Sequence, residues 1–152
     1  MRTLLPLLCS SLAAFAAEIP VLFAPTKADV PYAGTTEFRQ TLNVYAPKGK
    51  SAKPAPVIFW IHGGGWQGGE KTSVQLKPKF FTDMGYVFVS TNHRYVKAVP
   101  MNEIFADIAK SLHWTHDHVA EFGGDPERIV IMGHSSSWAP EEWPMITTRN
   151  AS

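Results

Sequence analysis

The sequence of 152 residues has little cysteine, little net charge and no long apolar run. Its single cysteine, Cys9, has no partner within the chain, so an internal disulfide is excluded. Lys and Arg number 14 against 13 Asp and Glu, a balance that gives no electrostatic footprint for nucleic acid or an anionic membrane. With 45% hydrophobic and 18% charged residues, the composition is typical of a globular protein and argues against disorder.

The first 16 residues differ from the rest of the chain. Arg2 is followed by the apolar and small-residue run TLLPLLCSSLAAFA, which closes on Ala14-Phe15-Ala16. A basic start, an apolar stretch and an A-x-A pattern predict a signal peptide over residues 1–16, and hence a secreted or periplasmic protein. The run is shorter than the roughly 20 apolar residues of a membrane span. Its removal would also remove Cys9, so the mature chain would hold no thiolate metal site and no cysteine nucleophile.

Three apolar segments without alternation predict strands that are buried on both faces, as in parallel sheets covered by helices. They are VIFWI (57–61), YVFVST (86–91) and RIVIM (128–132). FRQTLNVYAP (38–47) alternates like an outer strand, whereas residues 18–34 carry three prolines and are expected to form an irregular lead-in.

Helical patterns fill the gaps between the predicted buried strands. Residues 76–85 form a short one that ends at Gly85, and residues 101–122 form a longer one. Pro100 suits the entry of the longer helix, and Gly123-Gly124 suits its exit. The order strand, helix, strand, helix, strand predicts an α/β domain with right-handed crossovers.

A glycine-rich turn, HGGGWQGGEKT (62–72), follows the first buried strand. Its spacing satisfies the G-x-G-x-x-G fingerprint of dinucleotide-binding loops, but bulky Trp66 stands where a helix should begin. The next strand also lacks a carboxylate to hold a ribose. A P-loop is rejected because Glu70 precedes Lys71-Thr72 and would repel a phosphate.

The same turn fits an oxyanion hole. Acyl transfer needs backbone N–H donors aimed at the developing alkoxide, and glycines expose those donors without side chains in the way. An HGGG-type loop after a strand is the form that this device takes in lipases and esterases. A glycine-rich surface turn without a function is the alternative.

The segment GHSSS (133–137) follows the third buried strand and resembles a nucleophile elbow. In the pattern G-x-S-x-G the serine occupies a sharp turn between a strand and a helix. Gly133, His134 and Ser135 fit this pattern, and Ser137 replaces its last glycine. A serine after a strand is usually only a turn residue. The two motifs together, each at the carboxyl end of a buried strand, indicate a hydrolase.

The segments LNVYAP, VIFWIHGGGW, STNHRY and DIAKSLHWTHDHVAEFGGDPERIVIMGHS resemble the N-terminal half of an α/β-hydrolase. The resemblance is to the carboxylesterase and hormone-sensitive-lipase-like group, and within it to secreted feruloyl and acetyl-xylan esterases. It implies a three-layer α/β sandwich with a mostly parallel sheet, truncated after the nucleophile strand. Without the later strands, the far edge of RIVIM is expected to be unpaired and prone to aggregation. The same resemblance implies hydrolysis of a small-molecule ester without a cofactor or a metal. Aryl formamide hydrolysis is an alternative, since related enzymes share a similar HGG-x-W loop.

The resemblance also implies the roles of particular residues. Ser135 would be the nucleophile, and the backbone N–H groups of Gly63, Gly64 and Ser136 would form the oxyanion hole. The acid and the histidine base, which follow the serine in such enzymes, are not found in this chain. We therefore expect the chain as written to be incomplete and inactive. The alternative is a non-catalytic fragment that acts only as a binding or structural remnant.

The family pattern ends within SSWAPEEWPMITTRNAS, where Pro140 and Pro144 interrupt any helix. The chain is thereby divided into a signal peptide (1–16), the N-terminal part of an α/β-hydrolase domain (17–137) and a tail outside the family pattern (138–152).

No histidine of the chain is a convincing replacement for the missing base. The His134 side chain is expected to point away from Ser135, and His62 is expected to support the glycine-rich turn by hydrogen bonding. His93 follows a strand, but nothing in the sequence places it at the site. His113 and His116 share one face of the long helix, which predicts a solvated face rather than a metal site because no third ligand is visible.

Overall fold

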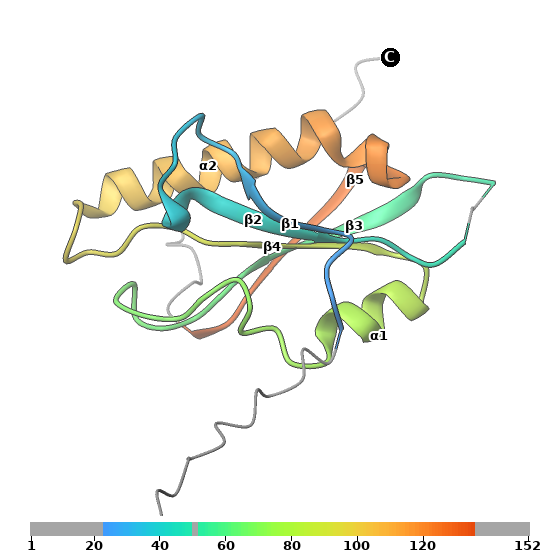
Figure 1. Ribbon diagram of the computed structural model, residues 1–152, viewed down its shortest axis with the longest axis horizontal. Helices are drawn as coiled ribbons and strands as arrows, with labels where there is room; N and C mark the ends of the chain where they lie inside the picture. The colour runs from blue at the N-terminus through green and yellow to red at the C-terminus, as the bar shows by residue number, and fades with distance from the viewer. Residues whose placement is uncertain (1–22, 50–51, 136–152) are drawn as a thin grey trace, which may run out of the picture.

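The computed structural model describes residues 23–49 and 52–135 (Figure 1). The predicted signal peptide, Ser136 and the tail at 138–152 lie outside these residues. The strands are β1 (Lys27–Pro31), β2 (Thr41–Tyr45), β3 (Ala55–Ile61), β4 (Val87–Thr91) and β5 (Gly124–Gly133). The helices are η1 (Phe38–Gln40), α1 (Lys77–Asp83), α2 (Met101–His118) and η2 (Val119–Phe122), of which η1 and η2 are 3₁₀ turns. No described helix is long and apolar enough to cross a membrane.

The strands form one sheet in the order β1-β2-β4-β3-β5. Strands β4, β3 and β5 are mutually parallel, whereas β1 pairs antiparallel with β2, and β2 with β4. The two helical connections between parallel strands lie on opposite faces of the sheet, α1 on one and α2 on the other (Figure 1). This arrangement of three layers confirms the predicted α/β class, with a mixed sheet in the part of the chain described.

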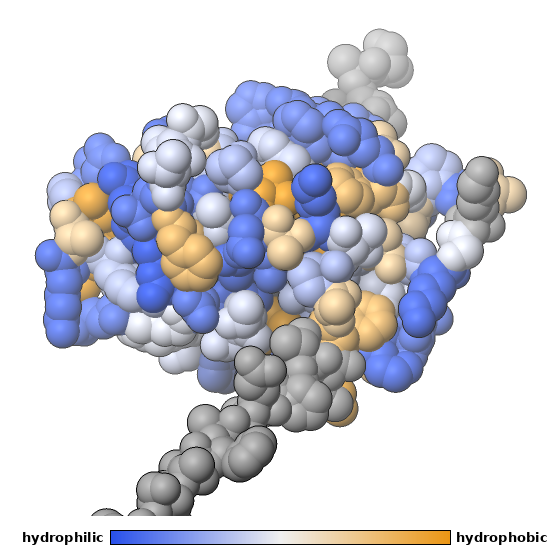
Figure 2. All heavy atoms as spheres, in the orientation of Figure 1, coloured by the Kyte–Doolittle hydropathy of each residue, from blue (hydrophilic) through white to orange (hydrophobic). Residues whose placement is uncertain are grey.

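Two apolar cores, one on each face, explain why β3 and β4 lack alternation. On the α2 side, Val57, Phe59 and Val89 pack with Ile104 and Ile108 of the helix. The other core, towards α1, is built from Tyr45, Ile58, Trp60, Val74 and Phe88. The face seen in Figure 2 is mainly hydrophilic with small separate hydrophobic patches, as expected of a globular surface.

The sequence pattern predicted the start, the buried face and the end of helix α2. Pro100 precedes it in an extended conformation, and the buried face carries Ile104 and Ile108. The predicted helical run to 122 is confirmed, with its last turn tightened into η2. Gly123, at φ +79°, then ends it in the left-handed conformation that glycine adopts without steric cost.

The expectation of an irregular lead-in over 18–34 is wrong for part of its length, because β1 forms there. Its register with β2 shifts between Lys27 and Val30, where Asp29 has a φ of +53°. The backbone N–H of Asp29 donates to the Asn43 side chain at 2.9 Å instead of joining the ladder. This irregularity, together with Pro31, hides the strand from a pattern based on alternation.

Strand β5 is present as predicted, and its far edge is unpaired in the described chain, as expected for an elbow strand without the strands that follow it in the family. The burial on both faces that its apolar run by itself predicts is wrong. Its only strand neighbour among residues 23–49 and 52–135 is β3. Val130, Ile131 and Met132 are therefore 51%, 45% and 36% exposed. An apolar edge strand with free backbone groups is a template for aggregation.

We predict that Val130→Lys raises the monomeric fraction of the purified chain, measured by size-exclusion chromatography with light scattering. A charge on an edge strand opposes pairing with a second chain. Val96→Lys is the matched control, because Val96 is also an exposed valine but lies outside the strands. Equal monomer fractions for the two variants would contradict the assignment of aggregation to the β5 edge.

Candidate active site

The glycine-rich turn and the predicted elbow meet at one edge of the sheet. Strands β3 and β5 are parallel neighbours, and Ile61 pairs with Gly133 at their carboxyl ends. Gly63 and Ser135 therefore leave neighbouring strands in the same direction. A Cβ atom on Gly63 would lie only 2.6 Å from the His134 carbonyl oxygen and 3.3 Å from the Ser135 Cβ. Only a glycine allows the turn to approach the elbow this closely.

The backbone of Ser135 is left-handed, with φ +62°. A residue with a Cβ adopts this conformation at a cost of about 1–2 kcal/mol. Such strain is expected of a serine held on the sharp turn of a nucleophile elbow. Ser135 is exposed, and Ser136, the third predicted oxyanion donor, lies beyond the described residues.

Gly64 folds the turn back on itself. Its φ is +132°, and a Cβ there would lie 2.2 Å from the Gly68 carbonyl oxygen. The Gly64 carbonyl accepts a hydrogen bond from the Gln67 N–H at 3.0 Å. The turn thus has a defined conformation, and it needs glycine at both predicted oxyanion positions.

His62 and His93 stack beneath the turn, with ring centroids 4.5 Å apart. The His62 Nδ1 lies 2.9 Å from the Gly63 carbonyl oxygen, and the His93 Nδ1 lies 2.7 Å from that of Arg94. Carbonyl oxygens only accept, so each Nδ1 is assigned the proton. The hydrogen bond expected of His62 is present, and both rings hold backbone at the site.

Burial keeps both imidazoles neutral. Desolvation by burial lowers the pKa of His62 to about 4. The hydrogen bond to the Gly63 carbonyl acts in the opposite direction but is the smaller effect. Desolvation also lowers the pKa of His93. Charging either ring would place an imidazolium against its stacked partner in a site closed to water.

Trp66 anchors the turn on the far side of His93. Its ring lies 5.4 Å from that of His93 and meets Phe105 of α2 edge-on at 5.7 Å. Its carbonyl accepts the Val96 N–H at 3.0 Å. The residue that argued against a dinucleotide-binding loop is therefore a packing anchor between the turn and α2.

Lys71 anchors the end of the turn and is almost fully buried, with 1% of its side chain exposed. Its Nζ lies 2.8 Å from an Asp29 carboxylate oxygen and 3.9 Å above the Phe38 ring. Its backbone N–H donates to the Asn92 side chain at 2.6 Å. These contacts tie the turn to β1 and to the end of β4, a role that the sequence pattern did not reveal.

Asp107 of α2 is a completely buried carboxylate that holds the segment after β4. It accepts hydrogen bonds from the Arg94 backbone N–H, from Arg94 Nε and Nη2 at 2.8 and 2.7 Å, and from Gln40 at 2.8 Å. Burial by itself raises the pKa of Asp107, but the hydrogen bonds from Arg94 and Gln40 prevail and hold it below its usual range. The network fixes the chain between His93 and α2.

The histidines of α2 lie away from these contacts. His113 and His116 are exposed, and the His113 Nδ1 lies 3.0 Å from an Asp117 carboxylate oxygen. This agrees with the predicted solvated face. Within residues 23–49 and 52–135, no group of three or more His, Cys, Asp or Glu residues is placed to hold a metal ion.

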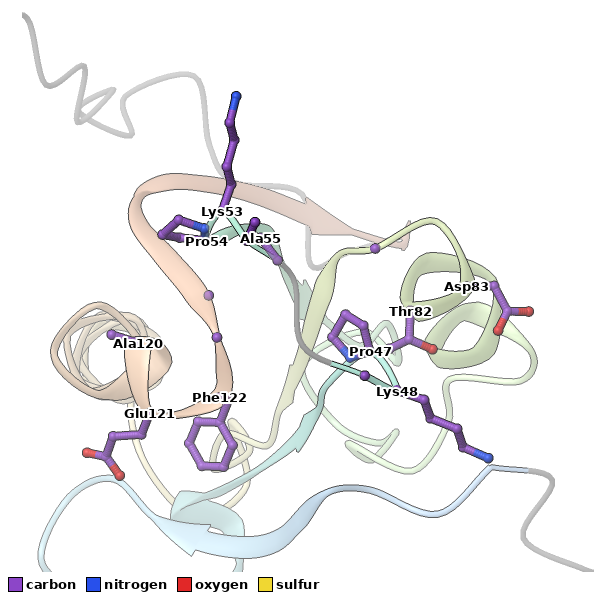
Figure 3. Close-up of a pocket in the computed structure, with 15 residues that line it drawn as sticks. Pro47, Lys48, Lys53, Pro54, Ala55, Thr82, Asp83, Ala120, Glu121 and Phe122 are labelled. Atoms are coloured by element: carbon purple, nitrogen blue, oxygen red, sulfur yellow. The ribbon is translucent and has the colours of Figure 1, made fainter.

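A surface hollow of about 840 Å³ lies at the opposite end of the sheet (Figure 3). Ala55 and Gly124, the first residues of β3 and β5, line it, whereas Gly63 and Ser135 do not. Figure 3 shows the side chains of Lys53 and Glu121 pointing in different directions rather than converging on a ligand position. The hollow therefore takes no part in the candidate site.

Comparison with known proteins shows that the chain is similar to proteins named as esterases. The BD-FAE family model matches residues 42–137. Venom carboxylesterase-6 of Apis mellifera is 32% identical over 120 residues, which cover 72% of this chain and 21% of the relative. Esterase B1 of Culex pipiens is 30% identical over 117 residues, covering 70% and 22%. The chain thus spans about a fifth of the length of these curated relatives.

Solved structures show the same fold. Esterase B from Lactobacillus rhamnosis superposes with a TM-score of 0.66 at 25% identity, covering 70% of this chain and 35% of that one. A thermophilic esterase from Thermogutta terrifontis gives a TM-score of 0.57 at 31% identity, covering 62% and 35%. Both proteins are esterases by name. The BD-FAE match over residues 42–137 includes the glycine-rich turn and Ser135.

We predict that Asp107→Asn lowers the free energy of unfolding by about 3 kcal/mol, measured by urea denaturation. The substitution removes the buried charge that accepts from Arg94 and Gln40. Among the described residues it leaves Arg94 with only the partly exposed Glu103 carboxylate, at 3.1 Å, as an acidic partner. Asp117→Asn on the exposed face of the same helix is the matched control and should change stability little. Similar losses in both variants would show that the Arg94–Asp107 network does not hold the fold.

We also predict that stability falls as the pH is lowered from about 6.5 towards about 4. The unfolded chain takes up protons in this window, while His62, with its pKa near 4, stays neutral in the folded state. Each such histidine contributes a slope of up to about 1.4 kcal/mol per pH unit. His62→Asn removes the ring and should flatten the slope in urea titrations at pH 7, 6 and 5. An unchanged slope would contradict the burial of a neutral His62.

Proposed function

The chain belongs to the BD-FAE family and to the carboxylesterase-like α/β-hydrolases, and we propose that it provides the nucleophile and oxyanion hole of a serine carboxylic-ester hydrolase. The close approach of Gly63 to Ser135 is the observation that carries this proposal. An oxyanion hole works only where its donors lie about 3 Å from the oxygen that develops charge on the carbon under attack.

In the proposed reaction the Ser135 hydroxyl attacks the carbonyl carbon of a small-molecule ester. The backbone N–H groups of Gly63, Gly64 and Ser136 stabilise the alkoxide of the tetrahedral intermediate. Collapse of the intermediate releases the alcohol and leaves an acyl group on Ser135, and water then hydrolyses this acyl-enzyme. The reaction needs no cofactor.

The general base is proposed to come from outside the 152 residues, together with the triad acid. His62 and His93 each use Nδ1 to hold a backbone carbonyl, and burial keeps them neutral. These contacts support a role in shaping the site rather than in shuttling protons. Taken alone, the chain is therefore proposed to be acylated slowly and to lack efficient turnover.

We further propose that residues 1–16 direct export, that residues 17–137 belong to the hydrolase domain, and that residues 138–152 are outside the family pattern. The end of the BD-FAE match at residue 137 supports the last of these limits.

Acylation of the purified chain tests the proposed function. On incubation with p-nitrophenyl butyrate at mildly alkaline pH, we expect a butyryl group on Ser135 in preference to the exposed Ser73, because only Ser135 is proposed to face oxyanion donors. Without an efficient base for deacylation, the acyl group should persist long enough for peptide mapping by mass spectrometry. Ser135→Ala should remove this modification and no other.

Modification spread over serines and lysines without preference for Ser135 would contradict the proposal and would favour a non-catalytic fragment. Aryl formamide hydrolysis, the other enzymatic reading, is tested in parallel with an N-formyl aniline, which would formylate the same serine.

A further inference from the structure

The carbonyl oxygen of Gly69 is held by two donors from different parts of the chain. The Tyr95 hydroxyl, from the segment after β4, donates to it, and Arg39 Nη1, from η1, donates at 3.0 Å. The guanidinium carbon of Arg39 also stacks 4.3 Å from the centre of the Tyr95 ring. We call these two side chains on the Gly69 carbonyl the Gly69 clamp.

Gly69 rests directly on the proposed oxyanion segment. A Cβ atom on Gly69 would lie 2.1 Å from the Gly63 carbonyl oxygen and 2.5 Å from the His62 Nδ1. There is no space between these atoms for a side chain or a water molecule. Any displacement of Gly69 towards Gly63 must therefore move Gly63 as well.

Gly63 is wedged between Gly69 and the elbow. On its other side stand the His134 carbonyl oxygen and the Ser135 Cβ, at 2.6 and 3.3 Å from an added Cβ. A continuous series of contacts thus runs from the Tyr95 hydroxyl through Gly69 and Gly63 to Ser135. The clamp lies at the start of this series and the proposed nucleophile at its end.

We propose that the Gly69 clamp sets the position of the Gly63 N–H relative to Ser135, with Tyr95 as a positioning residue of the esterase site. This inference rests on the proposed function and adds to it a residue that touches neither the substrate nor the nucleophile. A displacement of about 1 Å in such a site costs on the order of 100-fold in rate.

The side chains of the Gly69 clamp are held so that they keep donating to the Gly69 carbonyl. Burial in the first place raises the pKa of Tyr95, which keeps its hydroxyl protonated and able to donate. Arg39 is itself steadied by Glu70, whose carboxylate lies 3.8 Å from Nη1. The Tyr95 hydroxyl therefore remains a hydrogen-bond donor to the Gly69 carbonyl.

Tyr95→Phe in the full chain tests the proposal, because it keeps the stacked ring and removes only the hydroxyl. Tyr86→Phe is the matched control, since Tyr86 packs against Phe81 just before β4 begins, at the opposite end of that strand from the site. The first measurement is the rate of Ser135 acylation by p-nitrophenyl butyrate. We expect a loss of about tenfold or more for Tyr95→Phe and no loss for Tyr86→Phe.

The second measurement is amide hydrogen exchange, which does not depend on catalysis. The Gln67 N–H bonds to Gly64 within the turn, and the Val96 N–H bonds to Trp66 across it. Both amides should exchange faster in Tyr95→Phe, while the amides of β4 keep their protection. A merely structural role of the hydroxyl would lower the protection of the turn and the sheet alike.

The two measurements separate the possible failures. Wild-type acylation and wild-type exchange at Gln67 and Val96 in Tyr95→Phe would overturn the clamp. Absence of Ser135 acylation in the unmodified chain would overturn the proposed function, and exchange would still decide whether the clamp holds the turn. If Tyr95→Phe fails to fold, Arg39→Met removes the second donor and must raise the same two exchange rates for the clamp to stand.

Discussion

The parallel pairing of β3 with β5 is the constraint on which the candidate site depends. Their register, with Ile61 opposite Gly133, brings the glycine-rich turn and the elbow out of the sheet side by side. The pairing begins at Gly124, where a Cβ would lie 2.5 Å from a Val119 methyl group. Glycine is thus needed at both ends of this pair of strands, first for β5 to pass η2 and then for Gly63 to reach the elbow.

Several buried polar side chains lie around this pair of strands. The carboxyl ends of β4 and β3 carry Thr91, Asn92, His93 and His62, all buried. Lys71 and Asp107 then bring buried charges to the same edge of the sheet, each matched by an opposite charge. Polar contacts of this kind contribute less to stability than to specificity, because each group has few positions in which it is satisfied. These polar contacts hold the loop after β3 and the loop after β4, whose backbones have no regular hydrogen-bonding pattern.

Local patterns in the sequence predicted what depends on neighbouring residues. The unbroken apolar runs gave β3, β4 and β5, the 3.6-residue stripe gave α2, and the two glycine-containing motifs located Gly63 and Ser135. Strand β1 was missed because its bulge at Asp29 breaks the alternation. The apolar run of β5 alone predicted burial, and its unpaired edge was expected only from the family resemblance, because burial depends on which strands stand beside it.

The supporting residues of the site were missed for a related reason. The partners through which Lys71, Arg94 and Tyr95 support the site lie 13 or more residues away in the sequence. The residues next to each of them carry no pattern that would identify the partner. Asp107 left a signal that could have been used, since it lies three residues after Ile104 on the buried face of α2. A carboxylate on an apolar stripe implies a cationic partner, and Arg94 in the segment before the helix is the nearest arginine in sequence.

A crystal structure of the chain with a phosphonate bound covalently to Ser135 would test the central claim most directly. The phosphonyl oxygen takes the place of the alkoxide oxygen in the tetrahedral intermediate. We expect this oxygen to lie within about 3 Å of the backbone nitrogen of Gly63 or Gly64. A phosphonyl oxygen directed away from both amides would contradict the assignment of the glycine-rich turn as an oxyanion hole.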